Sequence, residues 1–173
     1  MHQEKMSRSE QRRFLESRRE DLREIFGTQN VADLPGKSGV WEIEEKNWRF
    51  YRIGEKGLLV LIENRLVPVL YQDFNPGVGI SLPSLIVDKN AVPHVSNGAD
   101  VMRPGVILVD GSFKKGNLVV VKDETYHKAL AVTEALEDSE RIEAAERGKV
   151  AKNLHYVGDK VWKIVASIAG RMM

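Results

Sequence analysis

Cysteine is missing from the 173 residues of the chain. Its absence excludes disulfides, thiolate metal sites and cysteine nucleophiles, and it fits a reducing compartment. The net charge at pH 7 is only +1, so composition alone gives no strong nucleic-acid signature, although charge can be sorted by face. Long hydrophobic runs are lacking too, because stretches such as LLVLI at 58–62 are far shorter than the roughly 20 residues that cross a bilayer. The first residues, MHQEKMSRSEQRR, contain no apolar signal region, so we expect a soluble, cytoplasmic protein without membrane contact.

Catalytic and metal-binding patterns are also scarce. The histidines are widely scattered and include no i,i+4 pair: His2, His94, His127 and His155. No G-x-S-x-G, P-loop or G-x-G-x-x-G pattern occurs, and the carboxylates of the VWEIEE run alternate as on a solvated strand face. His155 and Asp159 in NLHYVGDKVW could form a dyad, but a half-buried histidine at a hairpin turn is the favoured interpretation. We therefore expect no enzyme, no metal and no cofactor.

The first segment has a clear helix signal. Ser7-x-x-Glu10 is a capping box, apolar residues follow with a helical period, and Gly27 can supply a left-handed C-cap, which predicts a helix over 8–26. Its other face carries six arginines: Arg8, Arg12, Arg13, Arg18, Arg19 and Arg23. They could form a phosphate-facing stripe. A solvated face is favoured, because acidic residues are interleaved with them.

The pattern changes to a period of two between 39 and 71. The runs VWEIEE, WRFYRI, LLVLIE and RLVPVLY, separated by short turns, predict an antiparallel meander. Pro68 in the last run indicates an edge strand or a bulge. The stretch QDFNPGVGISLP at 72–83 breaks the pattern with two prolines and two glycines, and we place a domain boundary there.

Short strands recur in the second half. They are expected in SLIVD (84–88), GVILVD (105–110), LVVVKD (118–123), ALAVTEA (129–135), KVAKNLHYV and VWKIV. The second and third of these are joined by a turn through Gly111 and Gly116, and the last two flank a Gly158-Asp159 turn. One helix is predicted over 91–97, with Asn90 as N-cap, Pro93 in its first turn and Gly98 at its end. Another runs from Ser139 to about Arg147, with Gly148 closing it. This alternation predicts a small mixed barrel.

The stretch NGADVMRPGVILVDG, from Asn97 to Gly111, contains three glycines and one proline between two regular elements. It is not a nucleotide-binding loop, because the order is helix, loop, strand and no helix N-terminus is aimed at a phosphate. A Gly-Ala pair after a helix lets another backbone approach closely, although a structural cap is the favoured interpretation from the residues alone.

The second half resembles the PUA domain, a fold named for pseudouridine synthases and archaeosine transglycosylases. The resemblance rests on VDKNAVPHVSNGADVMRPGVI, FKKGNLVVV and KALAVTEALEDSERIEAAERGKVAKNLHYVGDKVWKI. Within them, G-A-x-V-M-x-P-G and a closing K/R-G-x-x-x-x-x-x-H-Y-x-G-D-x-x-W stand about 50 residues apart and cover about 84–165. The N-terminal half is similar to the malignant T-cell-amplified sequence proteins and their archaeal relatives. Ligatin is a longer relative of the same proteins. Pro93 and Arg103 depart from the family pattern.

The resemblance implies an RNA-binding surface on the short helix and the loop after it. Gly98 and Ala99 would let a ribose-phosphate strand come close, while Val101 and Met102 would tuck into the barrel and fix the loop. The candidate RNA-binding residues flank this surface: Lys89, Asn97, Gly98, Ala99, Met102, Arg103, Lys149 and Lys152. The four cations among them are candidates for phosphate contacts, and a solvated side chain stays the alternative for each lysine.

The expected fold is α+β. A small N-terminal α+β domain over 1–78, a helix plus an antiparallel meander, precedes a PUA-like mixed β-barrel over 79–173 with a short C-terminal extension. The resemblance implies an RNA-binding protein that contacts tRNA, rRNA or the small ribosomal subunit in translation initiation or recycling, with a translation-factor protein as a further partner. The alternatives are a ribosome-biogenesis or RNA-modification accessory factor and a protein-interaction module without direct RNA binding.

Overall fold

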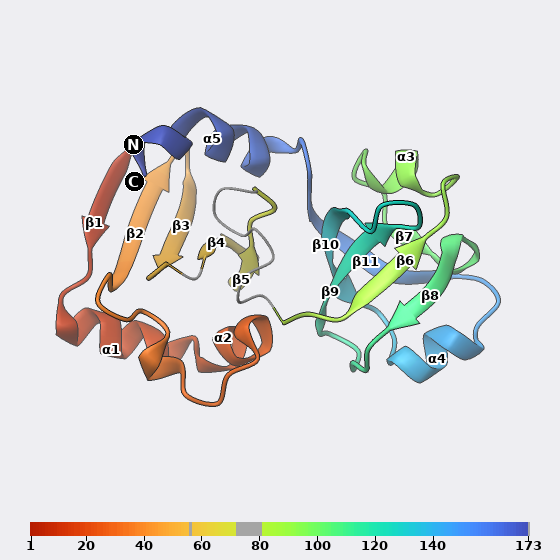
Figure 1. The fold of residues 1–173 in the computed structure, drawn as a ribbon, viewed down its shortest axis with the longest axis horizontal. Coiled ribbons are helices and arrows are strands. Elements are labelled where there is room, and N and C mark those ends of the chain that lie inside the picture. Colours follow the sequence, from red (N-terminus) through yellow and green to blue (C-terminus); the bar gives the residue numbers. More distant parts are fainter. Residues whose placement is uncertain (56, 72–80, 173) are drawn as a thin grey trace. The chain divides into compact units, whose positions relative to one another are not determined.

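The structure is a computed structural model that describes residues 1–55, 57–71 and 81–172 (Figure 1). Most of the predicted break at 72–83 lies outside the described residues. Tertiary contacts divide the chain into a first unit, Met1–Ser81 with Lys160–Met173, and a second unit, Leu82–Asp159. This division differs from the expected one at the C-terminus, because the residues from 160 onward belong with the first unit.

The first unit contains a five-stranded antiparallel sheet in the order β1-β2-β3-β4-β5 (Figure 1). Its strands are β1 (His2–Lys5), β2 (Val40–Glu45), β3 (Trp48–Ile53), β4 (Gly57–Ile62) and β5 (Arg65–Pro68). The last four are the predicted meander, and Pro68 lies in an edge strand of the described sheet, as predicted. The first strand was not predicted, because HQEK has no apolar alternation and is recognisable only by its pairing with β2.

Two helices replace the single helix predicted over 8–26. They are α1 (Arg8–Ser17) and α2 (Arg19–Phe26), and they meet at Arg18, which has φ −111° and ψ 16°. The guanidinium of Arg18 donates to the backbone carbonyl oxygen of Asn64 at 2.8 Å and to its side-chain oxygen at 3.1 Å, so this junction is tied to the β4–β5 turn. The predicted capping box and the left-handed C-cap at Gly27, φ 64°, are both present.

The last segment corrects the prediction that VWKIV forms a strand. It lies in helix α5 (Lys160–Ile168), whose buried residues follow the helical spacing i, i+3, i+4, i+7: Val161, Ile164, Val165 and Ile168. The ring of Trp162 lies 5.6 Å from that of Tyr71, and Arg52 donates to the carbonyl of Met172. Three β-branched residues in a short run favoured a strand, yet packing against the first unit favours the helix, since short apolar runs do not decide between the two.

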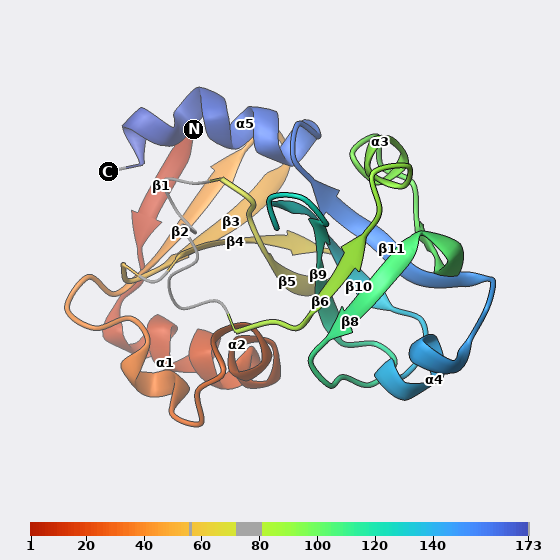
Figure 2. The same cartoon turned by 45° about the vertical axis from the view of Figure 1, so that its right-hand side comes forward.

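The second unit is a curled sheet in the order β7-β11-β10-β9-β6-β8, which accounts for the predicted small barrel (Figure 2). Its strands are β6 (Ser84–Val87), β7 (Val101–Met102), β8 (Val106–Asp110), β9 (Leu118–Asp123), β10 (Ala129–Ala135) and β11 (Lys149–Tyr156). The β6–β9 pair is parallel and the other pairs are antiparallel. Because β6 lies between β8 and β9, the expected turn through Gly111 and Gly116 does not form a hairpin.

The helices of the second unit are shorter than predicted. They are α3 (Val92–Val95) and α4 (Ser139–Ala144). Asn90 is not the N-cap of α3; instead the carboxylate of Asp88 accepts from the backbone N–H of Ala91 at 2.9 Å. Ser139 is the first residue of α4 and its hydroxyl accepts from the N–H of Phe113, so it fixes the loop between β8 and β9 instead of capping the helix. The first of these bonds is local, whereas the second joins residues 26 positions apart, which short motifs do not specify.

Candidate nucleic-acid interface

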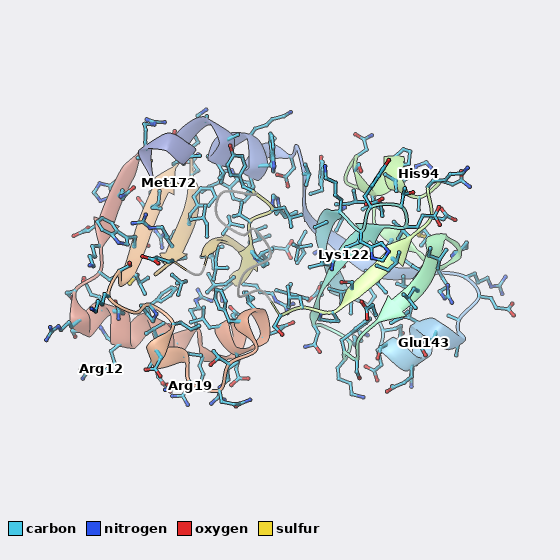
Figure 3. All side chains as sticks on the ribbon, viewed as in Figure 1. Arg12, Arg19, His94, Lys122, Glu143 and Met172 are labelled. Atoms are coloured by element: carbon cyan, nitrogen blue, oxygen red, sulfur yellow. The ribbon has the colours of Figure 1, made fainter. Side chains whose placement is uncertain are left out.

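A hollow of about 590 Å³ opens in the second unit beside α3 and the loop after it. Its lining residues come from the β6–α3 turn, α3, the following loop, β7, the short 3-10 turn Arg103–Gly105 and the start of β11: Asp88, Asn90, Ala91, His94, Val95, Ala99, Asp100, Val101, Met102, Pro104, Gly105 and Lys149. Most of these contribute apolar atoms, with His94, two carboxylates and one ammonium among them. Figure 3 shows His94 on α3 and Glu143 on α4 at opposite ends of the second unit. The hollow therefore lies at the α3 end of the second unit, beside the loop for which RNA contact is predicted.

Gly98 has the predicted positive φ, +93°, but it is not the C-cap of α3, because the helix ends at Val95 and its C-cap is Ser96. A side-chain carbon built at this position would lie 2.8 Å from the ring of Tyr156. Both its conformation and its close packing against Tyr156 require glycine. Glycine is therefore required at position 98 by the backbone conformation and packing of the domain, independently of any ligand.

A polar network holds the loop after α3. The side-chain amide of Asn153 donates to the carbonyls of Val95 at 3.2 Å and Ala99 at 3.1 Å, and its backbone N–H donates to Asp100 at 2.8 Å. The other carboxylate oxygen of Asp100 lies 2.9 Å from the ammonium of Lys149. Burial raises the pKa of Asp100, but the hydrogen bonds from Lys149 and Asn153 outweigh it, so the pKa lies below its ordinary value of 3.8. The loop is thus preorganised, and a carboxylate stands within it.

Arg103 is used differently from the expectation that it contacts phosphate. Its Nε donates to the carbonyl of Ile142 at 2.6 Å, and Nη1 donates to that of Val106 at 2.7 Å. A longer bond of 3.4 Å runs from Nη2 to the carbonyl of Glu143. Two of these acceptors are in the last turn of α4, where carbonyls favour a cation, although the Ile142 carbonyl also accepts from the N–H of Ala145 at 3.3 Å. The guanidinium therefore joins α4 to the loop and β8.

The remaining candidates differ in exposure. Asn97, Ala99 and Lys89 are exposed, as expected for contact residues. Val101 is 1% exposed and does tuck into the core, whereas Met102 is 50% exposed and does not. Lys152 is half-buried, and its charge acts on Asp100 together with that of Lys149. The structure brings Ala99, Lys149 and Lys152 together around Asp100, and it places Lys89 in the β6–α3 turn, where its backbone N–H donates to Glu124.

The six arginines predicted on one face of the N-terminal helical segment fall into two groups. Half are paired with acidic residues of the same segment: Arg18 with Asp21, Arg19 with Glu16 and Arg23 with Glu20. The others are exposed and form no ion pair within the part of the chain that the structure describes: Arg8, Arg12 and Arg13. Figure 3 shows Arg12 and Arg19 extending away from the sheet. The ion pairs of Arg18, Arg19 and Arg23 agree with the interpretation of a solvated face on which acidic residues balance the arginines.

His155 and Asp159 do approach each other. The Nδ1 atom of His155 lies 2.8 Å from a carboxylate oxygen of Asp159, which also accepts from the backbone N–H of Tyr156. His155 is fully buried and not half-buried as expected, so no substrate reaches its ring. The pair fixes the end of β11, and the interpretation as a structural histidine at a turn is the one that the burial favours.

Across residues 1–55, 57–71 and 81–172, no group of three or more histidine, aspartate or glutamate side chains could hold a metal ion. No helix in this described part is long and apolar enough to cross a membrane.

A segment of the second unit was missed by sequence reasoning. The β9–β10 loop presents Tyr126 with 80% of its surface exposed, the highest value among the exposed large hydrophobic side chains of the described chain. The available signal was a tyrosine in the polar run DETYHK between two strands. Asn153 and Tyr156, which hold the α3 loop, were also missed because their partners lie more than 50 residues away in the sequence.

Comparison with known proteins identifies the class. A model of the PUA domain matches residues 83–157, which lie within the second unit. An uncharacterized protein of Methanocaldococcus jannaschii is 44% identical over 143 residues, covering 80% of this chain and 85% of that protein. The chain therefore belongs to the family of PUA-domain proteins.

More distant relatives have names. Translation machinery-associated protein 20 of Saccharomyces cerevisiae is 30% identical over 86 residues, 46% of this chain and 48% of that protein. Malignant T-cell-amplified sequence 2 of Homo sapiens is 32% identical over 84 residues, 47% of this chain and 46% of that protein. The aligned region is thus about half the length of these relatives.

Two solved structures extend the similarity to nearly the whole chain. A hypothetical protein of Pyrococcus horikoshii is 26% identical with a TM-score of 0.74, covering 94% of this chain and 99% of that one. A PUA-domain protein of Aeropyrum pernix, 23% identical, has a TM-score of 0.76 over 95% of this chain and 91% of that one, which shows the fold. Both units therefore have counterparts in archaeal structures.

Proposed function

We propose that this chain binds RNA within the translation apparatus, through the surface formed by α3, the loop at 98–102 and the start of β11. Family membership supports RNA as the ligand, and the named relatives support translation as the setting. Transfer RNA and the small ribosomal subunit are the targets that we propose. The single observation that carries the assignment to this surface is the preorganised hollow beside α3.

The chemistry of the surface fits recognition of RNA shape and backbone. Ala99 and Asn97 are exposed beside a hollow that is largely apolar, and Met102 offers a polarisable side chain at its rim. Asp100 offsets much of the charge of Lys149, so the surface is not a strong polyanion attractor. We therefore propose that close contact with sugar and backbone contributes more to affinity here than the number of phosphates neutralised.

The direct test compares two alanine-to-glutamate variants by fluorescence anisotropy with labelled tRNA over a range of salt concentrations. Ala99→Glu places a carboxylate at the proposed surface, and Ala144→Glu makes the same change at an exposed position of α4. Ala99→Glu is expected to stay folded and to weaken binding, while Ala144→Glu should bind as the wild type does. Equal affinities for the two variants would move the RNA surface elsewhere.

Co-sedimentation with purified small ribosomal subunits separates the two proposed targets. Binding to subunits without binding to free tRNA would favour the subunit as the target. A wild-type protein that binds neither RNA would refute the proposal and favour a protein-interaction module. We also propose that the protein has no catalytic activity on nucleotides or RNA, which incubation with each and product analysis can test.

A further inference from the structure

The β9–β10 loop exposes an aromatic ring on a rigid support. The side chain of Tyr126 is 80% exposed, although tyrosine ordinarily buries most of its ring. One carboxylate oxygen of Asp123 accepts from the backbone N–H groups of Thr125 at 3.1 Å and Tyr126 at 2.7 Å. The other accepts from the N–H of Lys128 at 2.7 Å. The tyrosine is therefore exposed on a loop in which three backbone N–H groups donate to the carboxylate of Asp123.

Further contacts remove freedom from the same loop. His127 adopts a positive φ of 53°, and its N–H donates to the carbonyl of Asp123 at 3.1 Å. The backbone N–H of Tyr126 and its neighbours holds the pKa of Asp123 below the ordinary value, so the carboxylate is charged and stays an acceptor. Holding a large ring in water on an ordered loop costs free energy, so a ligand for the ring would offset that cost.

The loop is joined to the turn that leads into α3. The N–H of Glu124 donates to the carbonyl of Val87 at 3.1 Å, and the Glu124 carboxylate accepts from the N–H of Lys89 at 3.0 Å. Figures 1 and 2 show the β9–β10 loop and α3 at the same end of the curled sheet. A strand of RNA that crosses the α3 surface can therefore continue toward Tyr126.

The surroundings of the ring are polar and cationic. Lys89, Lys128 and His127 have exposed side chains, and Lys122 lies one residue before Asp123 at the end of β9. The carboxylates of Asp123 and Glu124 accept backbone N–H groups and stay charged, so Lys89, Lys122 and Lys128 outnumber the acidic residues of this loop by one. A protein-docking site would instead have apolar neighbours around the aromatic ring. An exposed ring with lysines beside it is typical of platforms for single-stranded nucleic acid.

Resting on the function proposed above, we propose that Tyr126 stacks on an unpaired base of the bound RNA and that Lys128 contacts an adjacent phosphate. The ring supplies a face that any base can cover, so this contact carries little sequence preference. The loop thereby adds a single-strand contact beyond the α3 surface.

The test uses fluorescein-labelled oligouridine of about twelve nucleotides, within the range of known single-strand site sizes. Tyr126→Ala should weaken binding by about 5- to 150-fold, the usual effect of removing one stacked base contact. Tyr126→Phe keeps the stacking face and should bind within about twofold of the wild type. Lys128→Ala should reduce the slope of log K against log salt by about 0.7, while Tyr126→Ala should leave that slope unchanged.

A matched control is Leu108→Ala, which removes an exposed apolar side chain from β8 and should leave affinity unchanged. Circular dichroism confirms that each variant folds. If the wild type binds RNA and Ala99→Glu weakens it, but Tyr126→Ala binds normally, the stacking contact is refuted while the proposed function survives. An equal loss in Tyr126→Phe, or a loss for ribosomal subunits without any loss for free RNA, would also refute stacking, and absence of RNA binding by the wild type would refute both proposals.

Discussion

Replacing Arg103 by alanine should reveal stability, and not RNA affinity, as the main role of this cation. The guanidinium donates two short hydrogen bonds, to Ile142 and Val106, and one long bond to Glu143. Bonds that involve a charged group contribute about 1.5–3 kcal/mol each. The side chain is partly exposed, so water replaces some of this contribution, and the third bond adds little. We therefore expect the free energy of unfolding of the second unit to fall by about 2–4 kcal/mol.

Urea denaturation followed by circular dichroism measures this change, and the midpoint should fall by about 1–2 M. Amide hydrogen exchange in β9 and β10 localises the effect to the second unit. Arg103→Lys should recover less than half of the loss, because one ammonium cannot reach three separated carbonyls in the planar geometry of a guanidinium. The reasoning fails if Arg103→Ala keeps the wild-type stability within about 0.5 kcal/mol while the salt slope of RNA binding drops by one unit.

Three further predictions follow from the same contacts. The pKa of Asp100 is depressed in the folded protein, so its charged form stabilises the fold above the ordinary carboxyl pKa, and this contribution is lost as pH falls through the depressed value. As pH falls, the urea midpoint should therefore decrease more steeply for the wild type than for Asp100→Asn. Parallel curves for the two proteins would contradict this. Gly98→Ala should cost about 1–2 kcal/mol or more, measured by thermal unfolding, because the residue has positive φ and the new methyl group meets Tyr156. His155→Ala should destabilise the fold by about 2–4 kcal/mol, since it empties a buried site and leaves Asp159 without its partner, and a wild-type urea midpoint would be inconsistent with a structural histidine.

Local rules predicted much of the fold from the sequence. The capping box at Ser7 and Glu10, the glycine cap at Gly27 and the four alternating strands all depend on residues close together in the chain, so short windows contain the whole signal. The same applies to Gly98, whose position just after an apolar helical turn predicted its positive φ. The family signature also pointed to the loop after α3, which lies beside the hollow, and contact of this loop with RNA stays a prediction.

Long-range contacts decided what the sequence could not show. VWKIV is helical because its apolar face packs on a unit that lies about 80 residues earlier in the chain. Arg103 carries the same charge whether it faces phosphate or the end of α4, and only the position of the Ile142 carbonyl distinguishes the two uses. The sequence shows Tyr126 only as a tyrosine in a polar loop, whereas the structure shows that the backbone of this loop is held by hydrogen bonds to the Asp123 carboxylate.

The return of the chain to the first unit makes residues 82–159 an insert of 78 residues (159 − 82 + 1) between β5 and α5. While the insert is unfolded, docking α5 must close a flexible loop of that length, which costs about 4 kcal/mol of chain entropy in addition to a constant. A folded insert holds its two ends at one fixed separation and removes most of that cost. We therefore expect folding of the second unit to accelerate folding of the first. Substitutions that destabilise the insert should slow the docking of α5, although they make no contact with that helix.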